Sequence, residues 1–320
     1  MGYKISGMGI YLPPRIEYSK ETGLKINKDE KWIIKKTGVY ERRVSDIDVD
    51  KMGAIAAEKA LLNNETPDLI INASGVPKQS IPDTSVFFQK ALKLEGVPCF
   101  SIHATCLSFL VALRNAISLI DTDAYNRILI ISADRGTLGR NFNEPESASL
   151  LGDGAASILI EKTNSQESIL KYWKMHTWSS AANLTEVRGG GTRLHPQDIK
   201  TKPSDNLFTM DGPAIYKIAR IKSYKMLLQT LKKNNLKKRD IDWIVPHQAS
   251  GKAITAYHSI GGFKESKVVN VISKTGNCVA ASLPMAFVTA VQDNRIRKGD
   301  LIYFTGTGAG LSMACCLFKY

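Results

Sequence analysis

The chain has 320 residues, 43% hydrophobic and 8% aromatic, which is enough to bury a large core in two units or one fused pair. Its formal charge of +13 attracts anions, so nucleic acid, anionic lipid, phosphorylated cofactors and acidic proteins all qualify as partners. No signal peptide and no apolar run of membrane-spanning length occurs, which predicts a cytoplasmic protein without membrane insertion. Five cysteines without paired CxxC spacing argue against a disulfide framework and a structural zinc site, and no metal is expected.

In chain order, residues 68–76 are expected to form a buried strand that ends in small residues. Residues 98–106 run as a strand to Cys106, a helical pattern continues to about residue 120, and an apolar strand follows at 128–132. This position makes Cys106 a candidate nucleophile, because unpaired N–H groups and the helix dipole favour thiolate over thiol. Taken alone, Cys106 could also be a small hydrophobe buried in the core.

The second half of the chain repeats this order. Residues 242–250 resemble the first strand, residues 268–277 lead to Asn277 and a helix that ends near residue 293, and a strand follows at 301–304. The repetition of strand, helix and strand predicts a duplicated α/β unit with layers in the order α-β-α-β-α.

This repeat divides the chain into a first half, residues 1–165, and a second half, residues 166–320. The segments at residues 17–50 and 178–212 break the symmetry. We expect them to form cap or pocket insertions.

The repeat places Cys106 and Asn277 at equivalent positions, each before a long helix, and His247 at a strand end. Pseudo-twofold symmetry would bring all three residues to one cleft. A cysteine suits acyl exchange with a thioester, and a neutral imidazole beside an amide N–H can stabilise an enolate or an oxyanion. Other interpretations exist, because cysteine proteases use the same residue types, His247 could be a core histidine and Asn277 a helix N-cap.

Two further segments bear on binding. Residues 305–310 contain a GxGxG pattern, which we interpret as a tight turn that brings a backbone N–H to the acyl oxygen, because no complete βαβ unit follows to support NAD binding. The basic run at residues 232–239 lacks interleaved aromatic residues and matches no nucleic-acid-binding pattern. It is either a solvated helix end or a docking patch for an acidic protein.

As a set, these motifs resemble ketoacyl-acyl-carrier-protein synthase III of the thiolase superfamily over essentially the whole chain. The resemblance implies the thiolase fold, in which two βαβαβαββ units form the five layers. The motifs that carry it are Trp32-Ile-Ile-Lys-Lys-Thr-Gly38, Cys106 before a helix, Leu151-Gly-Asp-Gly-Ala155, Pro246-His-Gln-Ala249, Gly276-Asn277 with Ala281-Ser-Leu-Pro284, and the glycine-rich last turn.

The resemblance implies an acyltransferase with two half-reactions and no permanently bound cofactor. Cys106 would take an acyl group from acyl-CoA, and His247 and Asn277 would hold the carbonyl of a malonyl thioester during decarboxylation. The carbanion would then attack the acyl-cysteine, in a Claisen condensation with malonyl-acyl-carrier protein that gives a 3-oxoacyl thioester.

The resemblance also assigns binding residues. The backbone N–H groups of Cys106 and Thr307 would form the oxyanion hole, and Trp32 would stack on the adenine of CoA beside Lys36. Lys252 would dock an acidic acyl carrier protein, and the enzyme would be a homodimer.

Several positions depart from the family pattern. Lys36 replaces a common arginine and lacks its planar fork for phosphate. Asp83 or Thr84 stands where relatives place an apolar residue of the primer tunnel, which would admit a short or polar primer. Three arginines could pair with a carboxylate on the primer or could simply be surface residues: Arg135, Arg140 and Arg193.

Two other functions fit the same residue types. The first is an acyltransferase on the same scaffold that moves the acyl group to an alcohol or amine without condensation. The second is a non-catalytic binder of acyl thioesters. Asn277 beside His247 favours condensation, because both donors are wanted chiefly for activation of the malonyl group. Nucleic-acid binding ranks last and no nucleic-acid partner is expected.

Overall fold

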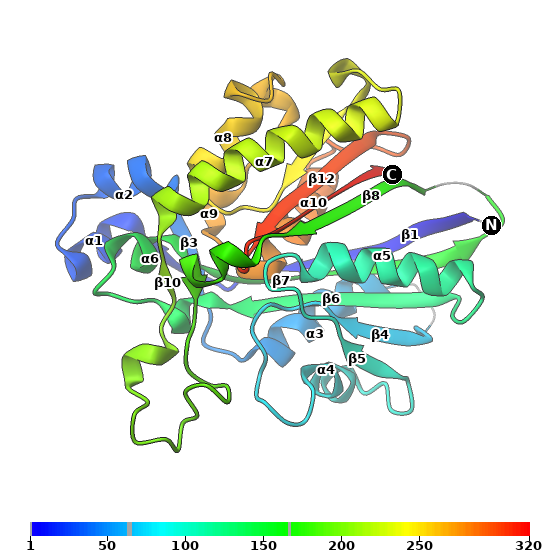
Figure 1. Ribbon diagram of the computed structural model, residues 1–320. Coiled ribbons are helices and arrows are strands. Elements are labelled where there is room, and N and C mark those ends of the chain that lie inside the picture. Colours follow the sequence, from blue (N-terminus) through cyan, green and yellow to red (C-terminus); the bar gives the residue numbers. More distant parts are fainter. Residues whose placement is uncertain (1, 63–65, 166–167) are drawn as a thin grey trace.

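The computed structural model describes residues 2–62, 66–165 and 168–320 of the chain. Two β-sheets alternate with three layers of helices, so the predicted α-β-α-β-α architecture is confirmed (Figure 1). Long apolar segments such as Ile128–Ile131 form the inner strands, because both faces of each sheet are covered.

The two sheets have the same strand order. The first sheet runs β1 (Gly2–Tyr11), β7 (Asp153–Thr163), β6 (Arg127–Arg135), β4 (Leu69–Asn72) and β5 (Cys99–Ser101). The second runs β8 (Ile169–Thr177), β13 (Ser312–Lys319), β12 (Leu301–Gly308) and β11 (Trp243–Pro246). In each sheet the first three strands are antiparallel and the next pair is parallel, which is the internal repeat that the sequence predicted.

One predicted strand is missing from the second sheet. Residues 268–271 were expected to pair as a strand, but Val268 makes only an isolated parallel bridge to Ile244. The chain turns at once into the short helix α9 (Ile272–Thr275), because the side-chain oxygen of Gln248 accepts the backbone N–H groups of Val271 and Ile272. Residues 268–271 therefore lie where β5 lies in the first sheet, but they form no strand.

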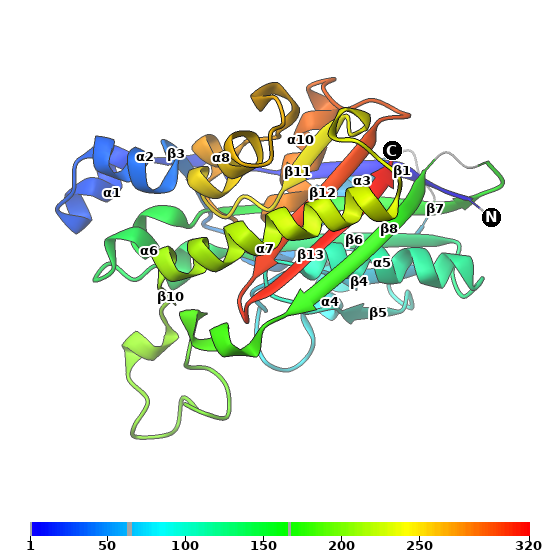
Figure 2. The ribbon, with the colours of Figure 1, turned by 45° about the horizontal axis from the view of Figure 1, so that its top comes forward.

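Six helices complete the layers (Figures 1 and 2). Between the sheets lie α5 (Ser108–Asp121) and α10 (Ser282–Gln292), which are buried around most of their circumference. The first sheet is covered by α3 (Val49–Leu61) and α4 (Thr84–Leu92), and the second by α7 (Gly212–Lys233) and α8 (Gly251–Ser259). This arrangement encloses the ends of β4, β11, α5 and α10 inside the molecule.

The segments that break the repeat lie outside the five layers, as predicted. The first contains β2 (Arg15–Tyr18), α1 (Ser19–Ile26), α2 (Glu30–Thr37) and β3 (Glu41–Val44), and the second contains β9 (Thr185–Glu186) and β10 (Thr209–Met210). Both lie at one end of the molecule beside α6 (Pro145–Leu150) in Figure 1. The boundary predicted between residues 165 and 166 falls outside the described residues and stays a prediction.

Within the described residues, no helix is long and apolar enough to span a membrane, and no group of three or more His, Cys, Asp or Glu is placed to hold a metal ion. All five cysteines are free thiols.

A buried carboxylate ties the two halves together. Asp134, at the end of β6, accepts the backbone N–H groups of Gly75 and Val76 at 2.8 Å each, and that of Ala281 at 2.9 Å. Ala281 directly precedes α10 in the second half, so one side chain fixes the end of β6, the loop after β4 and the start of α10.

We expect Asp134→Ala to lower the free energy of unfolding by about 3 kcal/mol, because three backbone N–H groups, one buried and two partly buried, lose a buried acceptor at about 1–3 kcal/mol for each fully buried group. Urea denaturation measures this loss. Asp68→Ala is the matched control, because Asp68 also accepts two backbone N–H groups, of Asn126 and Arg127, but is partly exposed. Water can replace its carboxylate, so a loss as large as that of Asp134→Ala would contradict the argument.

Candidate active site

Cys106 lies in a sharp turn between β5 and α5. Thr105 has a left-handed backbone conformation with φ of 52°, and the hydroxyl of Ser108 accepts the N–H of Ala104 at 3.0 Å and donates to the carbonyl of Thr105 at 2.7 Å. The turn thereby brings the chain from the sheet edge to the buried helix α5, which begins two residues after Cys106. The predicted position before a helix is confirmed.

The charge state of Cys106 differs from the expectation. Burial raises the pKa of its thiol to about 12, and the nearby carboxylate of Asp134 adds to the rise. Hydrogen bonds from the backbone N–H groups of Cys106 and Ala309 oppose it only in part. The prediction that the helix terminus favours a thiolate is therefore wrong, because desolvation outweighs the dipole, and the resting group is a neutral thiol.

His247 follows β11 and is almost completely buried. Its backbone N–H is held by the carbonyl of Thr305 on β12 at 2.8 Å. Burial lowers the pKa of the imidazole to about 4, so the ring is neutral at physiological pH. No partner for its Nδ1 atom is found among the described residues, which leaves the ring free of the carboxylate that orients the histidine of many hydrolases.

Asn277 lies five residues before α10, with a turn of 3₁₀ helix (Val279–Ala281) between them. Its Oδ1 atom accepts the backbone N–H of Val279 at 2.9 Å and the hydroxyl of Ser282 at 3.3 Å. Its Nδ2 atom donates to the carbonyl of Ala249 at 3.4 Å, two residues after His247. The amide is thus fixed through its oxygen.

Gly306 on β12 shows that the cysteine and histidine segments converge. A Cβ atom at this position would lie 3.0 Å from the Cβ of His247 and 3.1 Å from a methyl carbon of Leu107. Only glycine leaves room for both neighbours. The residue after the proposed nucleophile and the proposed histidine therefore pack on the same glycine from different elements.

The glycine-rich segment is the β-hairpin turn between β12 and β13. Strand β13 follows this segment and no helix does in the described residues, so it is not a dinucleotide-binding motif. The interpretation as a tight turn is confirmed. The backbone N–H that hydrogen bonds to Cys106 belongs to Ala309, which the sequence reasoning missed. Thr307 stays a prediction, because which residue of a hairpin faces the cysteine depends on the register and is not visible in the pattern.

A cavity extends outward from His247 between α7 and α8. Its inner wall includes Ala249 and the segment Thr305–Thr307, and the hydroxyl groups of Tyr257 and Thr305 lie 3.2 Å apart in this wall. Small and apolar residues of the two helices form the sides, among them Ala219, Leu227, Ala253 and Ala256. The site is therefore open to a slender, largely apolar ligand on this side.

The residues predicted to bind CoA lie on α2. Trp32 is half-buried, and the ammonium groups of Lys28 and Lys36 lie 5.6 and 5.7 Å from its ring centre. Lys36 also forms an ion pair with Glu146 at 3.0 Å. Glu146 thus partly neutralises the charge of Lys36, and the sequence analysis did not identify this glutamate.

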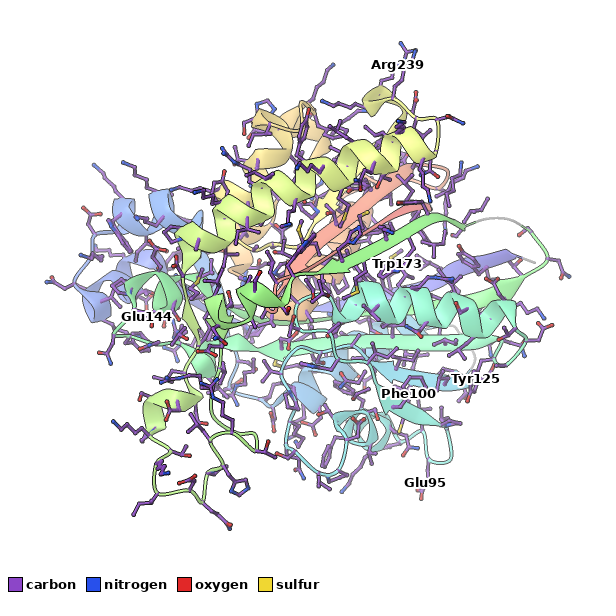
Figure 3. The ribbon with its side chains drawn as sticks, in the orientation of Figure 1. Glu95, Phe100, Tyr125, Glu144, Trp173 and Arg239 are labelled. Atoms are coloured by element: carbon purple, nitrogen blue, oxygen red, sulfur yellow. The ribbon has the colours of Figure 1, made fainter. Side chains whose placement is uncertain are left out.

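Lys252 is exposed near the start of α8 and lines a surface groove with Ile34, Lys35 and Gly38 of the α2 segment. The predicted CoA and carrier residues therefore share one side of the molecule. The basic run at residues 232–239 does not, because Tyr216 near the start of α7 lines this groove, whereas the run lies at the other end of this 22-residue helix, which is about 33 Å long at 1.5 Å per residue. Figure 3 shows Arg239 beyond that end of α7.

The three arginines considered for a primer carboxylate are separated from one another. Arg135 donates to the carbonyl of Ser45 at 2.8 Å, Arg140 is buried against Glu17, and Arg193 is an exposed residue 3.8 Å from Glu186. The interpretation as a surface residue fits Arg193 and is wrong for Arg140, which is buried, and pairing with a primer carboxylate stays a prediction.

The two residues considered for the primer tunnel organise the start of α4. Asp83 accepts the N–H of Ser85 at 2.9 Å and the hydroxyl of Ser101 at 2.8 Å, and the hydroxyl of Thr84 accepts the N–H of Lys78 at 2.9 Å. Asp83 therefore caps the N-terminus of α4, whereas Thr84 holds the loop that precedes the helix. A role in the tunnel stays a prediction.

Comparison with known proteins agrees with the fold. Residues 100–177 match the family model of 3-oxoacyl-[acyl-carrier-protein (ACP)] synthase III, and residues 231–320 match its C-terminal model. The beta-ketoacyl-[acyl-carrier-protein] synthase III of Rickettsia bellii is 30% identical over 100% of both chains. The crystal structure of 3-oxoacyl-[acyl-carrier-protein] synthase III from Aquifex aeolicus superimposes with a TM-score of 0.90 at 28% identity, and covers 100% of both chains.

A second solved structure, from Pseudomonas aeruginosa, covers 100% of this chain and 98% of its own, with a TM-score of 0.90 at 23% identity, and supports the fold. The protein is thus a thiolase-fold acyltransferase. The chain belongs to the 3-oxoacyl-[acyl-carrier-protein] synthase III family.

The neutral thiol gives a testable pH dependence. We expect the rate of Cys106 alkylation by iodoacetamide to rise about tenfold per pH unit from pH 7 to 9 without levelling off, because only the small thiolate fraction reacts. Peptide mapping by mass spectrometry measures the rate at each pH. Cys99, on the neighbouring strand β5, reports the behaviour of the reagent in the same digest. A rate that is already constant at pH 7 would show a stable thiolate and contradict this assignment.

Proposed function

We propose that the protein is a decarboxylative condensing enzyme that joins an acyl group from acyl-CoA to the malonyl unit of an acyl carrier protein. The observation that carries this proposal is the packing of His247 and of Leu107, the neighbour of Cys106, on Gly306, together with the hydrogen bond from Asn277 to Ala249 two residues after His247, in a chain of the synthase III family. A cysteine, a neutral histidine and a fixed amide are the groups that this chemistry requires.

In the first half-reaction, the sulfur of Cys106 attacks the thioester carbonyl of acyl-CoA. The carbon–sulfur bond to CoA breaks, the proton of the cysteine passes to the departing CoA thiolate, and an acyl-cysteine remains. We assign the oxyanion hole to the backbone N–H groups of Cys106 and Ala309, because both already point at the sulfur. In this assignment Ala309 replaces Thr307, the residue that the family resemblance implied.

In the second half-reaction, the malonyl thioester loses carbon dioxide, and negative charge develops on the carbonyl oxygen of the resulting enolate. The N–H groups of His247 and Asn277 stabilise that charge. The carbanion then attacks the acyl-cysteine, and the Cys106 thiolate that is released takes up a proton. The high pKa of Cys106 favours this last step, and the low pKa of His247 keeps the ring a neutral donor.

The binding residues complete the proposal. Trp32 and Lys36 would hold the nucleotide part of CoA, and Lys252 would contact the acidic carrier protein at the same face. The enzyme would act as a homodimer in the cytoplasm, with no cofactor retained between turnovers. Transfer to an alcohol or amine is not favoured, because Asn277 keeps its amide fixed beside the histidine segment.

The first test uses the two half-reactions separately. With a panel of acyl-CoAs, wild-type protein should gain one acyl group on Cys106, and malonyl-carrier protein should remove it with one carbon dioxide released per acyl group. Intact mass and carbon dioxide release measure the two steps. An acyl adduct that persists with malonyl-carrier protein but moves to alcohols or amines would overturn condensation.

Two variants assign the residues within this reaction. Cys106→Ala should abolish acylation, whereas Asn277→Ala should leave acylation in place and slow malonyl decarboxylation by 10²–10³-fold, as expected for a lost oxyanion donor. Equal loss of both steps in Asn277→Ala would contradict the division of roles.

The carrier contact can be tested by charge reversal. Lys252→Glu should raise the KM for malonyl-carrier protein severalfold and leave Cys106 acylation by acyl-CoA unchanged, because only the carrier presents an extended acidic surface. Lys232→Glu is the matched control, since this exposed lysine has the same charge but lies at the far end of α7. If both variants raise the KM equally, the effect is one of net charge and Lys252 is not a docking residue.

A further inference from the structure

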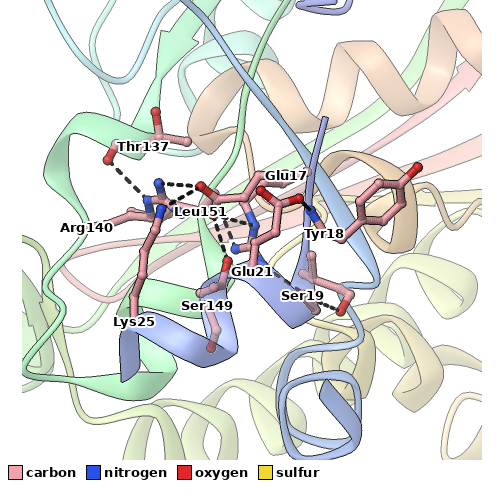
Figure 4. A network of polar contacts seen from close by, with 12 residues as sticks. Glu17, Tyr18, Ser19, Glu21, Lys25, Thr137, Arg140, Ser149 and Leu151 are labelled. Carbon is pink, nitrogen blue, oxygen red and sulfur yellow. Dashed lines mark hydrogen bonds and ion pairs between the residues drawn. The ribbon is translucent and has the colours of Figure 1, made fainter. Parts of the chain in front are cut away.

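A cluster of buried charged residues lies behind Asn277. Glu17 and Arg42 are 1% and 0% exposed, and Arg140 is 8% exposed. Figure 4 shows Glu17 between Arg140 and Lys25, with Leu151 beside the cluster. Burial of charges is costly unless each is paired, so this cluster needs an explanation beyond stability.

Glu17 is fully engaged by its partners. One carboxylate oxygen accepts Arg140 at 2.5 Å and the hydroxyl of Thr22 at 2.7 Å, and the other accepts Lys25 at 3.1 Å. These hydrogen bonds outweigh burial and lower the pKa of Glu17 to about 2. Glu17 is therefore ionised without any help from Arg42.

Arg42 is bonded differently. Its Nε atom lies 3.7 Å from Glu17 and has no hydrogen-bond partner in the part of the chain that the structure describes. Its two terminal nitrogens donate to the carbonyl of Leu151 and the hydroxyl of Ser19, each at 3.4 Å. Burial lowers the pKa of Arg42 to about 10, so the side chain is still charged at neutral pH. The guanidinium of Arg42 therefore donates to the Leu151 carbonyl and makes no hydrogen bond to Glu17 among the described contacts.

Leu151 is joined directly to the Asn277 backbone. The two residues form an isolated parallel bridge, in which the N–H of Asn277 donates to Leu150 at 2.9 Å and the N–H of Gly152 donates to the carbonyl of Asn277 at 3.0 Å. The bridge connects Leu151 in the first half of the chain with Asn277 in the second half, whose side chain is the proposed catalytic amide.

Both strands of this bridge pack on Arg42. A Cβ atom at Gly152 or Gly276 would lie 3.5 or 3.3 Å from the Cβ of Arg42, and at Gly152 it would also clash with the carbonyl of Thr275 at 2.0 Å. Gly276 has a φ of 67°, a left-handed conformation that suits glycine. The backbone on each side of Asn277 is thus fitted closely against this arginine.

We propose that Arg42, held in place by Glu17, is a positioning residue that sets the backbone of Asn277 for malonyl decarboxylation. Arg42 touches no reacting group, and it acts through the Leu151 carbonyl and the bridge to Asn277. Cys106 lies on a different element and takes no contact from this cluster, so its acylation does not depend on Arg42. The inference rests on the proposed function, in which Asn277 serves only the second half-reaction.

The test compares the two half-reactions in Arg42→Met, which keeps an unbranched apolar stem in the buried space but removes the charge and the donors of the side chain. We expect carbon dioxide release from malonyl-carrier protein to fall at least about tenfold relative to Cys106 acylation by acyl-CoA, since a small displacement of a catalytic group costs this much or more. A purely structural role would lower both steps together, in proportion to the loss of folded protein.

Arg140→Met is the matched control, because Arg140 bonds the same carboxylate but makes no hydrogen bond to Leu151. We expect it to lower the Tm and to leave the ratio of the two rates unchanged. If Arg42→Met does not fold, Arg42→Lys replaces it, since a single ammonium cannot contact both Glu17 and Leu151 as the guanidinium does, and the ratio should still fall.

Asn277→Ala separates failure of the inference from failure of the proposed function. If Asn277→Ala slows decarboxylation selectively but the Arg42 variants keep the wild-type ratio of rates, the positioning role is overturned and the proposed function stands. If Asn277→Ala leaves decarboxylation unchanged, the proposed function fails and the positioning role fails with it.

Discussion

Removal of the reacting groups from water is the constraint on which the rest of this structure depends. Burial raises the pKa of Cys106 to about 12 and lowers that of His247 to about 4, so both groups are neutral at pH 7. The site therefore holds no thiolate–imidazolium pair of the kind that activates cysteine proteases. A neutral pair suits acyl exchange between thiols followed by enolate stabilisation, because a neutral imidazole still carries one ring N–H, which can donate to the substrate oxygen when charge develops there.

The five-layer fold supplies that dry centre. Helices α5 and α10 lie between the sheets and bring Cys106 and Asn277 from the two halves into the interior, while the end of β11 supplies His247. The ion pairs of Glu17 with Arg42 and Arg140 do not line the cavity beside His247. Glu17 pairs with both Arg42 and Arg140 behind the Leu151–Asn277 bridge, where their fixed geometry contributes without placing these charges beside the thiol.

Much of this arrangement could be predicted from the sequence. The internal repeat predicted two equivalent sheets and the positions of Cys106 and Asn277 before long helices, because apolar runs and small-residue turns follow directly from local patterns. The strand expected at residues 268–271 failed, since Gln248 turns that segment into a helix through contacts 23 and 24 residues apart in the chain.

Other features depend on tertiary structure and had no local signal. The identity of Ala309 as the residue that contacts Cys106 follows from hairpin register, and the direction of the thiol pKa depends on how completely the site is buried. Arg42 occurs in a short strand of mixed charge, Glu41–Val44, that reads as an exposed segment in the sequence. Its complete burial comes from packing against Gly152 and Gly276, which lie more than a hundred residues further along the chain.

The surface and the interior therefore have separate tasks in the proposed function. The ion pair of Lys36 with Glu146 is half-exposed on both sides, and such pairs contribute little to stability, so a doubly charged phosphate competes well for the lysine. Surface charge of this kind affects the rate at which substrates associate with the enzyme, and salt screens it over about 8–10 Å. The buried centre is shielded from that screening, and the chemistry at Cys106 and His247 is set by desolvation. The lysine in place of the family's arginine thus bears on how substrates arrive and leaves the reacting groups unaltered.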